Sequence, residues 1–210
     1  MENPVMIFGA KSMGRAALEI FQSRNILVYC FLDDDESLYN TEIDQVTVMG
    51  KTTDDGFLKY VGKKCEAFVA VEEPQKRKEI IQLLIERRKV MPVNAIHDRT
   101  FLASSVRIGH GNFINSGAIL NAGVSIGSHC VINSNALLDT NAVLEDHVII
   151  GTGCMINQGV VVGEGAVIGS GVIISANVKI GKNATIAHGS LVVQNVEEGA
   201  TVFGVPAKKV

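Results

Sequence analysis

Large aliphatic residues recur every six positions through the second half of the chain. A period of six fits neither an α-helix, whose apolar face repeats about every 3.6 residues, nor a half-buried strand, which alternates every two. It is typical of a hexapeptide-repeat parallel β-helix, in which each hexad supplies one short strand and one turn. The series comprises Leu102, Ile108, Ile114, Leu120, Ile126, Ile132, Leu138, Leu144, Ile150, Ile156, Val162, Ile168, Ile174, Ile180, Ile186 and Val192.

Small apolar residues precede most of these large ones by two positions. If both series point inward, each hexad adds one large and one small side chain to ladders that run along the axis. With three hexads per triangular coil, residues about 18 apart stack at about 4.8 Å, which predicts about five coils between residues 100 and 195. The smaller series comprises Val106, Ala118, Val124, Cys130, Ala136, Ala142, Val148, Cys154, Val160, Ala166, Val172, Val178 and Ala184.

The first part of the chain alternates strand and helix patterns, which predicts a small parallel α/β domain of Rossmann-like type. Residues 91–99 read as a linker, with Pro92 and Asn94 as breakers. We therefore expect an α/β domain over residues 1–94 and a β-helix with a C-terminal tail over 95–210. The expected strands are 4–8, 26–32, 46–48 and 67–71, and the expected helices are 13–23, capped by Ser12, and 74–89.

The composition narrows the range of possible functions. The formal net charge of −3 and the pI near 6.0 give no basic footprint for nucleic acid. The apolar runs are shorter than the roughly 18 residues of a membrane span, so no span is expected. The four cysteines lack CxxC spacing and are expected to be buried, reduced thiols, which suits a cytoplasmic protein. No spacing of metal ligands stands out.

A glycine turn between the first strand and the first helix is a candidate ligand site. Free N–H groups at a helix N-terminus favour an anion, and Lys11 adds positive charge. The next strand ends in carboxylates that suit a ribose or a base. The alternatives are a tight turn without a ligand and a solvated acidic turn. The candidate binding residues are Gly9, Ala10, Lys11, Ser12, Asp33 and Asp34.

Histidine supplies the candidate base. His129 and His147 are 18 residues apart, so they should stack on one edge of the β-helix. His147 follows Glu145 and Asp146, whose carboxylates could orient it or raise its pKa as a general base. Histidines in simple solvated turns are the alternative.

The chain resembles the hexapeptide-repeat acyltransferases of the sialic-acid O-acetyltransferase and UDP-4-amino-sugar N-acetyltransferase type. The resemblance covers nearly the whole chain, and the N-terminal motifs and the tail make it fairly specific. The residues that carry it, besides the hexads, are Phe8-Gly9-Ala10 with Ser12, Phe31-Leu32-Asp33-Asp34, Asn177-Val178-Lys179-Ile180-Gly181 and Gly204-Val205-Pro206-Ala207-Lys208.

This resemblance implies a left-handed β-helix and a homotrimer with active sites between subunits. The N-terminal domain would hold a nucleotide sugar, with the glycine turn near the phosphates and Asp33 and Asp34 near the ribose or base. Acetyl would pass from acetyl-CoA to a sugar amine or hydroxyl in surface-glycan biosynthesis. The resemblance places acetyl-CoA along the β-helix, near Gln158, Gly159, Ala176, Gly204 and Lys208.

The family's catalytic histidine falls on Thr140 in this chain, and a second family histidine falls near Ile149. Threonine is no base near neutral pH, so three readings stay open. His147 acts as a relocated base; transfer proceeds to an amine without a strong protein base; or the chain is a silent relative that binds a nucleotide sugar or a partner enzyme. In the first two readings a backbone N–H at Gln158 and Gly159 would still serve the thioester oxygen.

Overall fold

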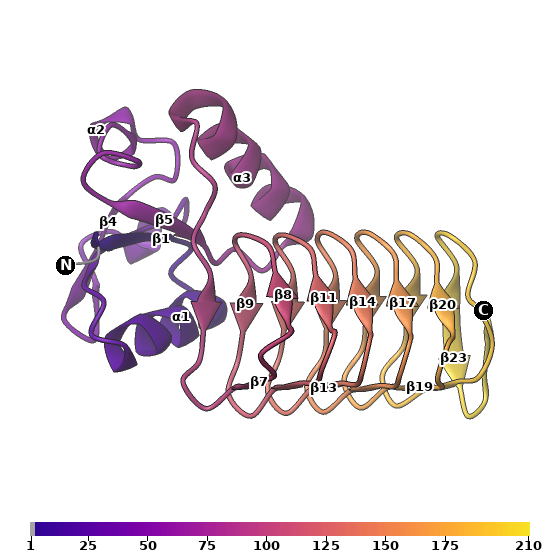
Figure 1. Cartoon of the computed structure of the whole chain (residues 1–210). Helices are drawn as coiled ribbons and strands as arrows, with labels where there is room; N and C mark the ends of the chain where they lie inside the picture. Colours follow the sequence, from indigo (N-terminus) through magenta and orange to yellow (C-terminus); the bar gives the residue numbers. More distant parts are fainter. Residues whose placement is uncertain (1–2) are drawn as a thin grey trace. The chain divides into compact units, whose positions relative to one another are not determined.

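The computed structural model describes residues 3–210, which divide into two compact units, one ending at Ala95 and one spanning Ile96–Val210. The first unit is an α/β domain built on a five-stranded sheet with the order β3-β4-β2-β1-β5 (Figure 1). All neighbours in this sheet are parallel except β3 and β4. Its strands are β1 (Val5–Phe8), β2 (Val28–Leu32), β3 (Glu42–Ile43), β4 (Val46–Gly50) and β5 (Glu66–Val69).

Two longer helices pack on this sheet. Alternate strand residues point to opposite faces. Met6 and Phe8 of β1 therefore join the core cluster that contains Leu84 of α3, whereas Phe68 of β5 meets Phe21 of α1 at a ring-centroid distance of 5.7 Å. The helices are α1 (Ser12–Ser23), α2 (Asp55–Leu58) and α3 (Pro74–Arg88), with a short 3₁₀ helix η1 (Glu36–Leu38).

The expected strands and long helices form, with ends that shift by one or two residues. The prediction that Ser12 caps the first helix is wrong. α1 begins at Ser12 itself, and the extended Lys11 before it gives no side-chain cap. The N–H of Met13 instead donates to the carboxylate of Glu72, far away in the sequence. β3, η1 and α2 are too short to show in the hydrophobic pattern.

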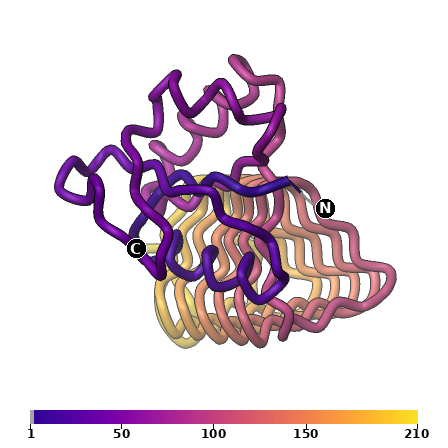
Figure 2. Tube along the Cα trace, turned by 90° about the vertical axis from the view of Figure 1, so that its left-hand side faces the viewer, coloured from indigo at the N-terminus to yellow at the C-terminus, as the bar shows by residue number. Residues whose placement is uncertain are grey.

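The second unit is a left-handed parallel β-helix, and Figure 2 shows its coils one behind another. Paired strands lie eighteen residues apart, as in Ile119 beside Leu137. Three sheets result, with the orders β22-β19-β16-β13-β10-β7, β20-β17-β14-β11-β8 and β24-β23-β21-β18-β15-β12-β9-β6. The strands are β6 (Ala95–Ile96), β7 (Phe101–Leu102), β8 (Arg107–Ile108), β9 (Phe113–Ile114), β10 (Ile119–Leu120), β11 (Ser125–Ile126), β12 (Val131–Ile132), β13 (Leu137–Leu138), β14 (Val143–Leu144), β15 (Ile149–Ile150), β16 (Met155–Ile156), β17 (Val161–Val162), β18 (Val167–Ile168), β19 (Ile173–Ile174), β20 (Lys179–Ile180), β21 (Thr185–Ile186), β22 (Leu191–Val192), β23 (Thr201–Gly204) and β24 (Ala207–Lys209).

The predicted interior ladder is confirmed from Ile114 to Val192, where every large member of the series is buried. Leu102 departs from the prediction: its side chain is 38% exposed, because β7 is the terminal strand of its sheet and has a neighbouring rung on one side only. Two polar residues, Asn112 and Ser190, occupy small inward positions. Asn112 donates to the carbonyl of Gly127 and accepts from the N–H of Cys130, which satisfies its buried amide.

Between residues 111 and 189, each corner of the coil contains one residue in the left-handed backbone region. Along one coil these are Asn135, Asn141 and His147, with φ near +60°. Glycine, asparagine and histidine tolerate this conformation better than β-branched residues do. The turn residues are therefore a second sequence signal for the repeat.

The coil continues beyond residue 195, where the hexad pattern had placed its end. Val196 forms a bridge to Ile180, and β23 pairs in parallel with β21. The chain then turns back as β24, antiparallel to β23. This hairpin covers the last rung of one sheet. Among residues 3–210, no helix combines the length and hydropathy that crossing a membrane requires.

Candidate active site

A cavity of about 340 Å³ lies in the α/β domain at the carboxyl ends of β1, β2 and β5. Gly9 follows β1, Asp33 and Asp34 follow β2, and residues 70–73 follow β5. This is the edge at which ligands bind in open parallel sheets. The residues that line the cavity are Gly9, Lys11, Asp33, Asp34, Thr52, Ala70, Val71, Glu72, Glu73 and Lys76.

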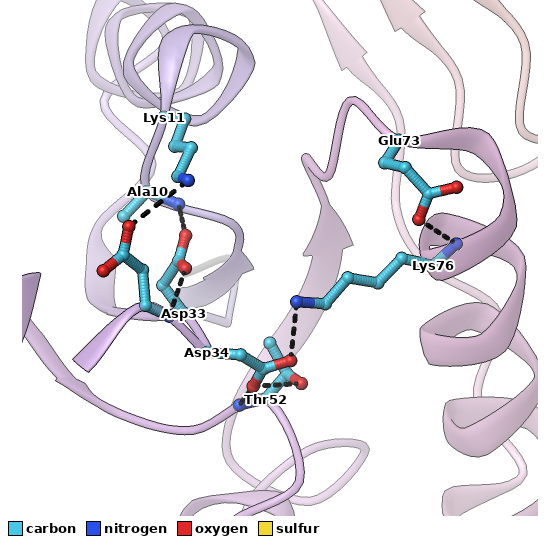
Figure 3. A network of polar contacts seen from close by, with 8 residues as sticks. Ala10, Lys11, Asp33, Asp34, Thr52, Glu73 and Lys76 are labelled. Carbon is cyan, nitrogen blue, oxygen red and sulfur yellow. Dashed lines mark hydrogen bonds and ion pairs between the residues drawn. The ribbon is translucent and has the colours of Figure 1, made fainter.

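Asp33 holds the glycine turn in place (Figure 3). Its buried carboxylate accepts hydrogen bonds from the N–H of Ala10 at 2.7 Å and from the N–H of Asp35 at 2.9 Å. Gly9 has φ +111°, and a Cβ there would lie 2.7 Å from the carbonyl oxygen of Ala70. The glycine is therefore required by the close approach of the next strand end. Asp33 thus stabilises the turn through hydrogen bonds inside the protein.

Asp34 is the centre of an ionic network at the cavity wall (Figure 3). Its carboxylate accepts from the N–H and the hydroxyl of Thr52, both at 2.9 Å, and pairs with the ammonium of Lys76 at 3.0 Å. Partial burial by itself would raise the pKa of Asp34. The hydrogen bonds from Thr52 and Lys76 outweigh it and hold this pKa below its ordinary value.

Replacing Lys76 by methionine should raise the pKa of Asp34, because an ionic donor is lost and burial remains. A depressed carboxyl pKa stabilises the fold at pH values above the unfolded pKa, near 3.9, and this stability disappears as pH falls through the folded pKa. In Lys76→Met this contribution should be smaller, and its loss should be complete at a higher pH, because the folded pKa of Asp34 lies closer to the unfolded value. Carbon-detected NMR titration of the Asp34 carboxyl between about pH 2 and 6 measures this folded-state pKa. Lys78→Met on the same helix is the control, and an unchanged Asp34 titration in Lys76→Met would contradict the network.

The predicted residues do not all reach the cavity. Gly9, Lys11, Asp33 and Asp34 line it, whereas Ala10 contributes the N–H that Asp33 accepts, and Ser12 is exposed at the start of α1. Lys11 pairs with Asp35 at 3.3 Å.

Six cavity residues escaped the sequence analysis: Thr52, Ala70, Val71, Glu72, Glu73 and Lys76. Glu72 has a signal, since it directly follows the expected strand 67–71. Thr52 and Lys76 have none, because they reach the cavity only through the strand order.

The second candidate site is the corner of the β-helix between β13 and β14, where Thr140 lies. Asp139 accepts hydrogen bonds from the N–H of Thr140 at 2.7 Å, from its hydroxyl at 3.3 Å and from the Asn121 amide at 3.0 Å. The Thr140 N–H, and then the Asn121 amide, lower the pKa of Asp139. This corner therefore presents an oriented, ionised carboxylate.

Gln158 and Ala176 follow Thr140 along the same corner, one coil apart. The N–H of Gly159 donates to the carbonyl of Thr140 at 3.0 Å, and the N–H of Asn177 donates to that of Gln158 at 2.9 Å. The N–H of Gln158 makes no hydrogen bond within residues 3–210, so it can serve a ligand. Gln158, Gly159 and Ala176 thus lie together.

Gly204 and Lys208 lie elsewhere in the same unit. Gly204 ends β23 and donates its N–H to the Ser190 hydroxyl at 3.2 Å, and Lys208 faces Phe203 across the hairpin. This hairpin extends the sheet of β21, so the structure does not bring these two residues to the Thr140 corner.

His147 lies on the next corner, between β14 and β15, and so does not share the corner of Thr140 within one chain. It stacks on His129 with a ring-centroid distance of 5.1 Å and an interplanar angle of 24°, which confirms the predicted stacking. The neighbouring carboxylates bind backbone groups of adjacent coils: Asp146 accepts from the N–H of Ser128, and Glu145 accepts from the N–H of Glu164.

Neither a metal nor a cysteine nucleophile is indicated by the side chains at these sites. No group of three or more His, Cys, Asp or Glu residues in the described part of the chain is arranged to hold a metal ion. All four cysteines are buried and free, as predicted. Burial, with a smaller effect from Cys65, raises the pKa of the Cys30 thiol to about 12, far from a reactive thiolate.

Two family descriptions match the chain. "PglD N-terminal domain" matches residues 4–84, and "Bacterial transferase hexapeptide (six repeats)" matches residues 141–176 and 159–194. No functionally curated protein sequence matches significantly.

Among solved structures, PerB from Caulobacter crescentus in complex with CoA and GDP-perosamine is similar, with 26% identity, a TM-score of 0.89, and 99% of this chain and 97% of that chain covered. Two further structures of the Caulobacter perosamine N-acetyltransferase, at 27% identity, carry a histidine replaced by asparagine or alanine.

The acetyltransferase domain of PglB from Neisseria gonorrhoeae, in complex with acetyl coenzyme A, shares the fold at 22% identity and a TM-score of 0.89, with 100% of both chains covered. WeeI from Acinetobacter baumannii does so at 23% identity and 0.87, with 99% of both covered. The two family matches fall one on each unit of the structure. The chain thus combines a PglD N-terminal domain with bacterial transferase hexapeptide repeats, in agreement with the resemblance found in the sequence.

Proposed function

We propose that this protein transfers acetyl from acetyl-CoA to the amine of a nucleotide-linked amino sugar in surface-glycan biosynthesis. The observation that carries the proposal is the similarity, along 99% of the chain, to PerB in complex with CoA and GDP-perosamine. The cavity at the strand ends is the proposed nucleotide-sugar site. The corner of Thr140, Gln158 and Ala176 is the proposed site of the thioester end of acetyl-CoA. Gly204 and Lys208, which lie away from this corner, are proposed to contact the far end of the CoA chain.

The proposed chemistry uses the groups on this corner. The sugar amine attacks the thioester carbonyl, a C–N bond forms, and the C–S bond breaks to release CoA as its thiol. The free N–H of Gln158 is suited to stabilise the oxyanion that develops on the carbonyl oxygen. Asp139, ionised and fixed by Thr140 and Asn121, is suited to orient the amine.

An amine acceptor fits Thr140 better than a hydroxyl does. Loss of a general base typically costs about 10²–10⁴-fold, and a hydroxyl depends on that base more than an unprotonated amine does. Positioning of the two substrates would carry much of the remaining rate. We therefore favour N-acetylation over O-acetylation.

Release of the CoA thiol, measured with acetyl-CoA and a panel of UDP- and GDP-linked amino sugars, tests the proposal. Turnover above background with at least one amino sugar, and none with its hydroxyl counterpart, is the expected result. The presence of threonine at position 140 favours one competing function, a silent member that binds a nucleotide sugar or a partner enzyme. Calorimetry that detects a nucleotide sugar but no acetyl-CoA, with thiol release at background, would establish that function instead.

His147 as the base stays a prediction, and one variant decides it. Since His147 and Thr140 occupy different corners of one chain, we expect His147→Ala to keep acetyl transfer within about 3-fold of the native rate, compared with the 10²–10⁴-fold that a base is worth. Rates across pH, with the oligomeric state as a check on folding, are the measurement. A loss of about 100-fold or more with assembly intact would establish His147 as the base.

We also propose a homotrimer. The outward residue of every strand in the sheet from β7 to β22 is apolar, and four of them are among the most exposed large hydrophobic residues, whereas the neighbouring sheet presents Arg107 and Lys179. Such a continuous apolar strip is typical of a contact with another protein. The strip comprises Phe101, Ile119, Leu137, Met155, Ile173 and Leu191.

A cytoplasmic location is proposed as well. It is supported by the four free thiols, since cysteines persist unpaired in reducing compartments.

A further inference from the structure

The cavity in the α/β domain has an unexpected charge for a site that receives a diphosphate. Four carboxylates line it, from Asp33, Asp34, Glu72 and Glu73, against two ammonium groups, from Lys11 and Lys76. The ammonium groups already pair with carboxylates, Lys76 with Asp34 and Lys11 with Asp35. The cavity is therefore net negative.

Most of these carboxylates are committed to the protein itself. Asp33 holds the glycine turn, and Asp34 binds Thr52 and Lys76. Glu73 accepts from the N–H groups of Gln75 and Lys76 and so caps α3. Each has a structural reason that is independent of any ligand.

Glu72 also bonds to a helix N-terminus, but to that of α1, which follows the glycine turn at the cavity. It is exposed, and its carboxylate accepts from the N–H of Met13 at 3.1 Å, in the first turn of the twelve-residue helix α1. Helix N-termini attract anions because their first N–H groups have no partner within the helix. The chain thus places a carboxylate of the cavity wall on the N-terminus of α1, where a phosphate oxygen would otherwise be attracted.

We propose that Glu72 is a specificity-determining residue of this cavity, an internal anion that competes with the phosphate groups of the ligand. The inference rests on the proposed nucleotide-sugar site. A diphosphate gains the Met13 N–H only when the Glu72 carboxylate leaves it, and the carboxylate then repels the phosphate from nearby. Glu72 weakens the binding of a ligand in proportion to its negative charge. The choice among ligands of equal charge then depends on their uncharged parts.

The test is calorimetric titration of the full chain and of Glu72→Gln with UDP and GDP. Glutamine keeps an oxygen acceptor for the Met13 N–H, so α1 should fold as before. Removing the like charge, and replacing the carboxylate on the Met13 N–H by a more weakly bound neutral acceptor, should tighten binding by roughly 5- to 30-fold. Glu42→Gln, which removes an exposed acid from β3 away from the cavity lining, is the matched control and should bind as the native chain does.

A charge series separates competition from loosening of the structure. For the base that binds, the gain in Glu72→Gln should be largest for the diphosphate, smaller for the monophosphate and negligible for the nucleoside. Equal gains for all three would overturn the proposal, because a structural change has no reason to follow phosphate charge. Weaker diphosphate binding in Glu72→Gln would also overturn it and would make Glu72 a ligand contact.

The two proposals fail in different ways. If the native chain binds a nucleoside diphosphate and Glu72→Gln binds it no better, the inference about Glu72 is wrong and the nucleotide site stands. If neither chain binds UDP or GDP at millimolar concentration, the nucleotide site fails and the inference fails with it. Binding that appears only in Glu72→Gln supports the inference in its strongest form.

Discussion

Replacing Met155 by glutamate should convert the proposed trimer to monomers. Met155 lies in the middle of the apolar strip and is 43% exposed in the single chain. Adjacent rungs are about 4.8 Å apart, so the strip of six residues extends about 24 Å along the β-helix. A carboxylate buried in the middle of such a contact without a partner costs several kcal/mol in each subunit. Light scattering coupled to size exclusion measures the mass directly.

The single chain should keep its fold in this variant. The inward neighbour of Met155 is Ile156, which remains buried in the interior ladder. Thr185→Glu, at an exposed outward position of another sheet, is the control and should remain trimeric. A trimeric Met155→Glu protein would remove the strip from the interface, and a monomeric native chain would remove the trimer itself.

The interior of the β-helix could be predicted because its physical rule is local. Each hexad repeats the same strand and turn, so a residue such as Leu138 faces inward for the same reason as Ile156. The outward strip recurs every 18 residues, or three hexads, one residue before a large inward residue, and could have been found by the same count. Leu102 shows where the rule ends, because a terminal rung lacks a neighbour on one side.

The candidate site was predictable only in part, because it depends on contacts between distant segments. Gly9 and Asp33 follow buried strands, and a parallel sheet brings such strand ends together whatever the remainder of the fold. Lys76 reaches Asp34 only because the sheet order is β4-β2-β1-β5, which the hydrophobic pattern does not give. The wrong prediction for Ser12 has the same origin, since the N–H of Met13 in the first turn of α1 donates to the distant Glu72 and not to a local cap.

Corner positions follow from counting, and this separates the two candidate bases. Residues 140 and 147 differ by seven, one more than a hexad, so they fall on successive corners. The resemblance to the family puts its catalytic histidine at the first of these, where the chain has Thr140. The sequence alone left open whether His147 reaches the same place, and the coil geometry makes that difficult within one subunit.

Thr140→His should therefore raise the rate of acetyl transfer, by about 100-fold if the new imidazole acts as a general base. Thr140 is half-buried and precedes the left-handed residue Asn141, so a histidine fits its backbone without strain. Asp139 already binds the N–H and the hydroxyl of Thr140 and is suited to orient the imidazole. The added rate should appear as pH rises through about 6.5, because only the neutral imidazole accepts a proton.

Thr152→His is the matched control, since Thr152 occupies the same turn position on another corner of the β-helix. It should leave the rate unchanged, and adding Asp139→Asn to Thr140→His should remove part of the gain. Equal rates for Thr140→His and the native chain, with acetyl-CoA binding intact, would mean that acetyl transfer does not take place at the Thr140 corner. An equal gain from Thr152→His would show that an imidazole on any exposed turn raises the rate. The proposal that the Thr140 corner is the active site would then be contradicted.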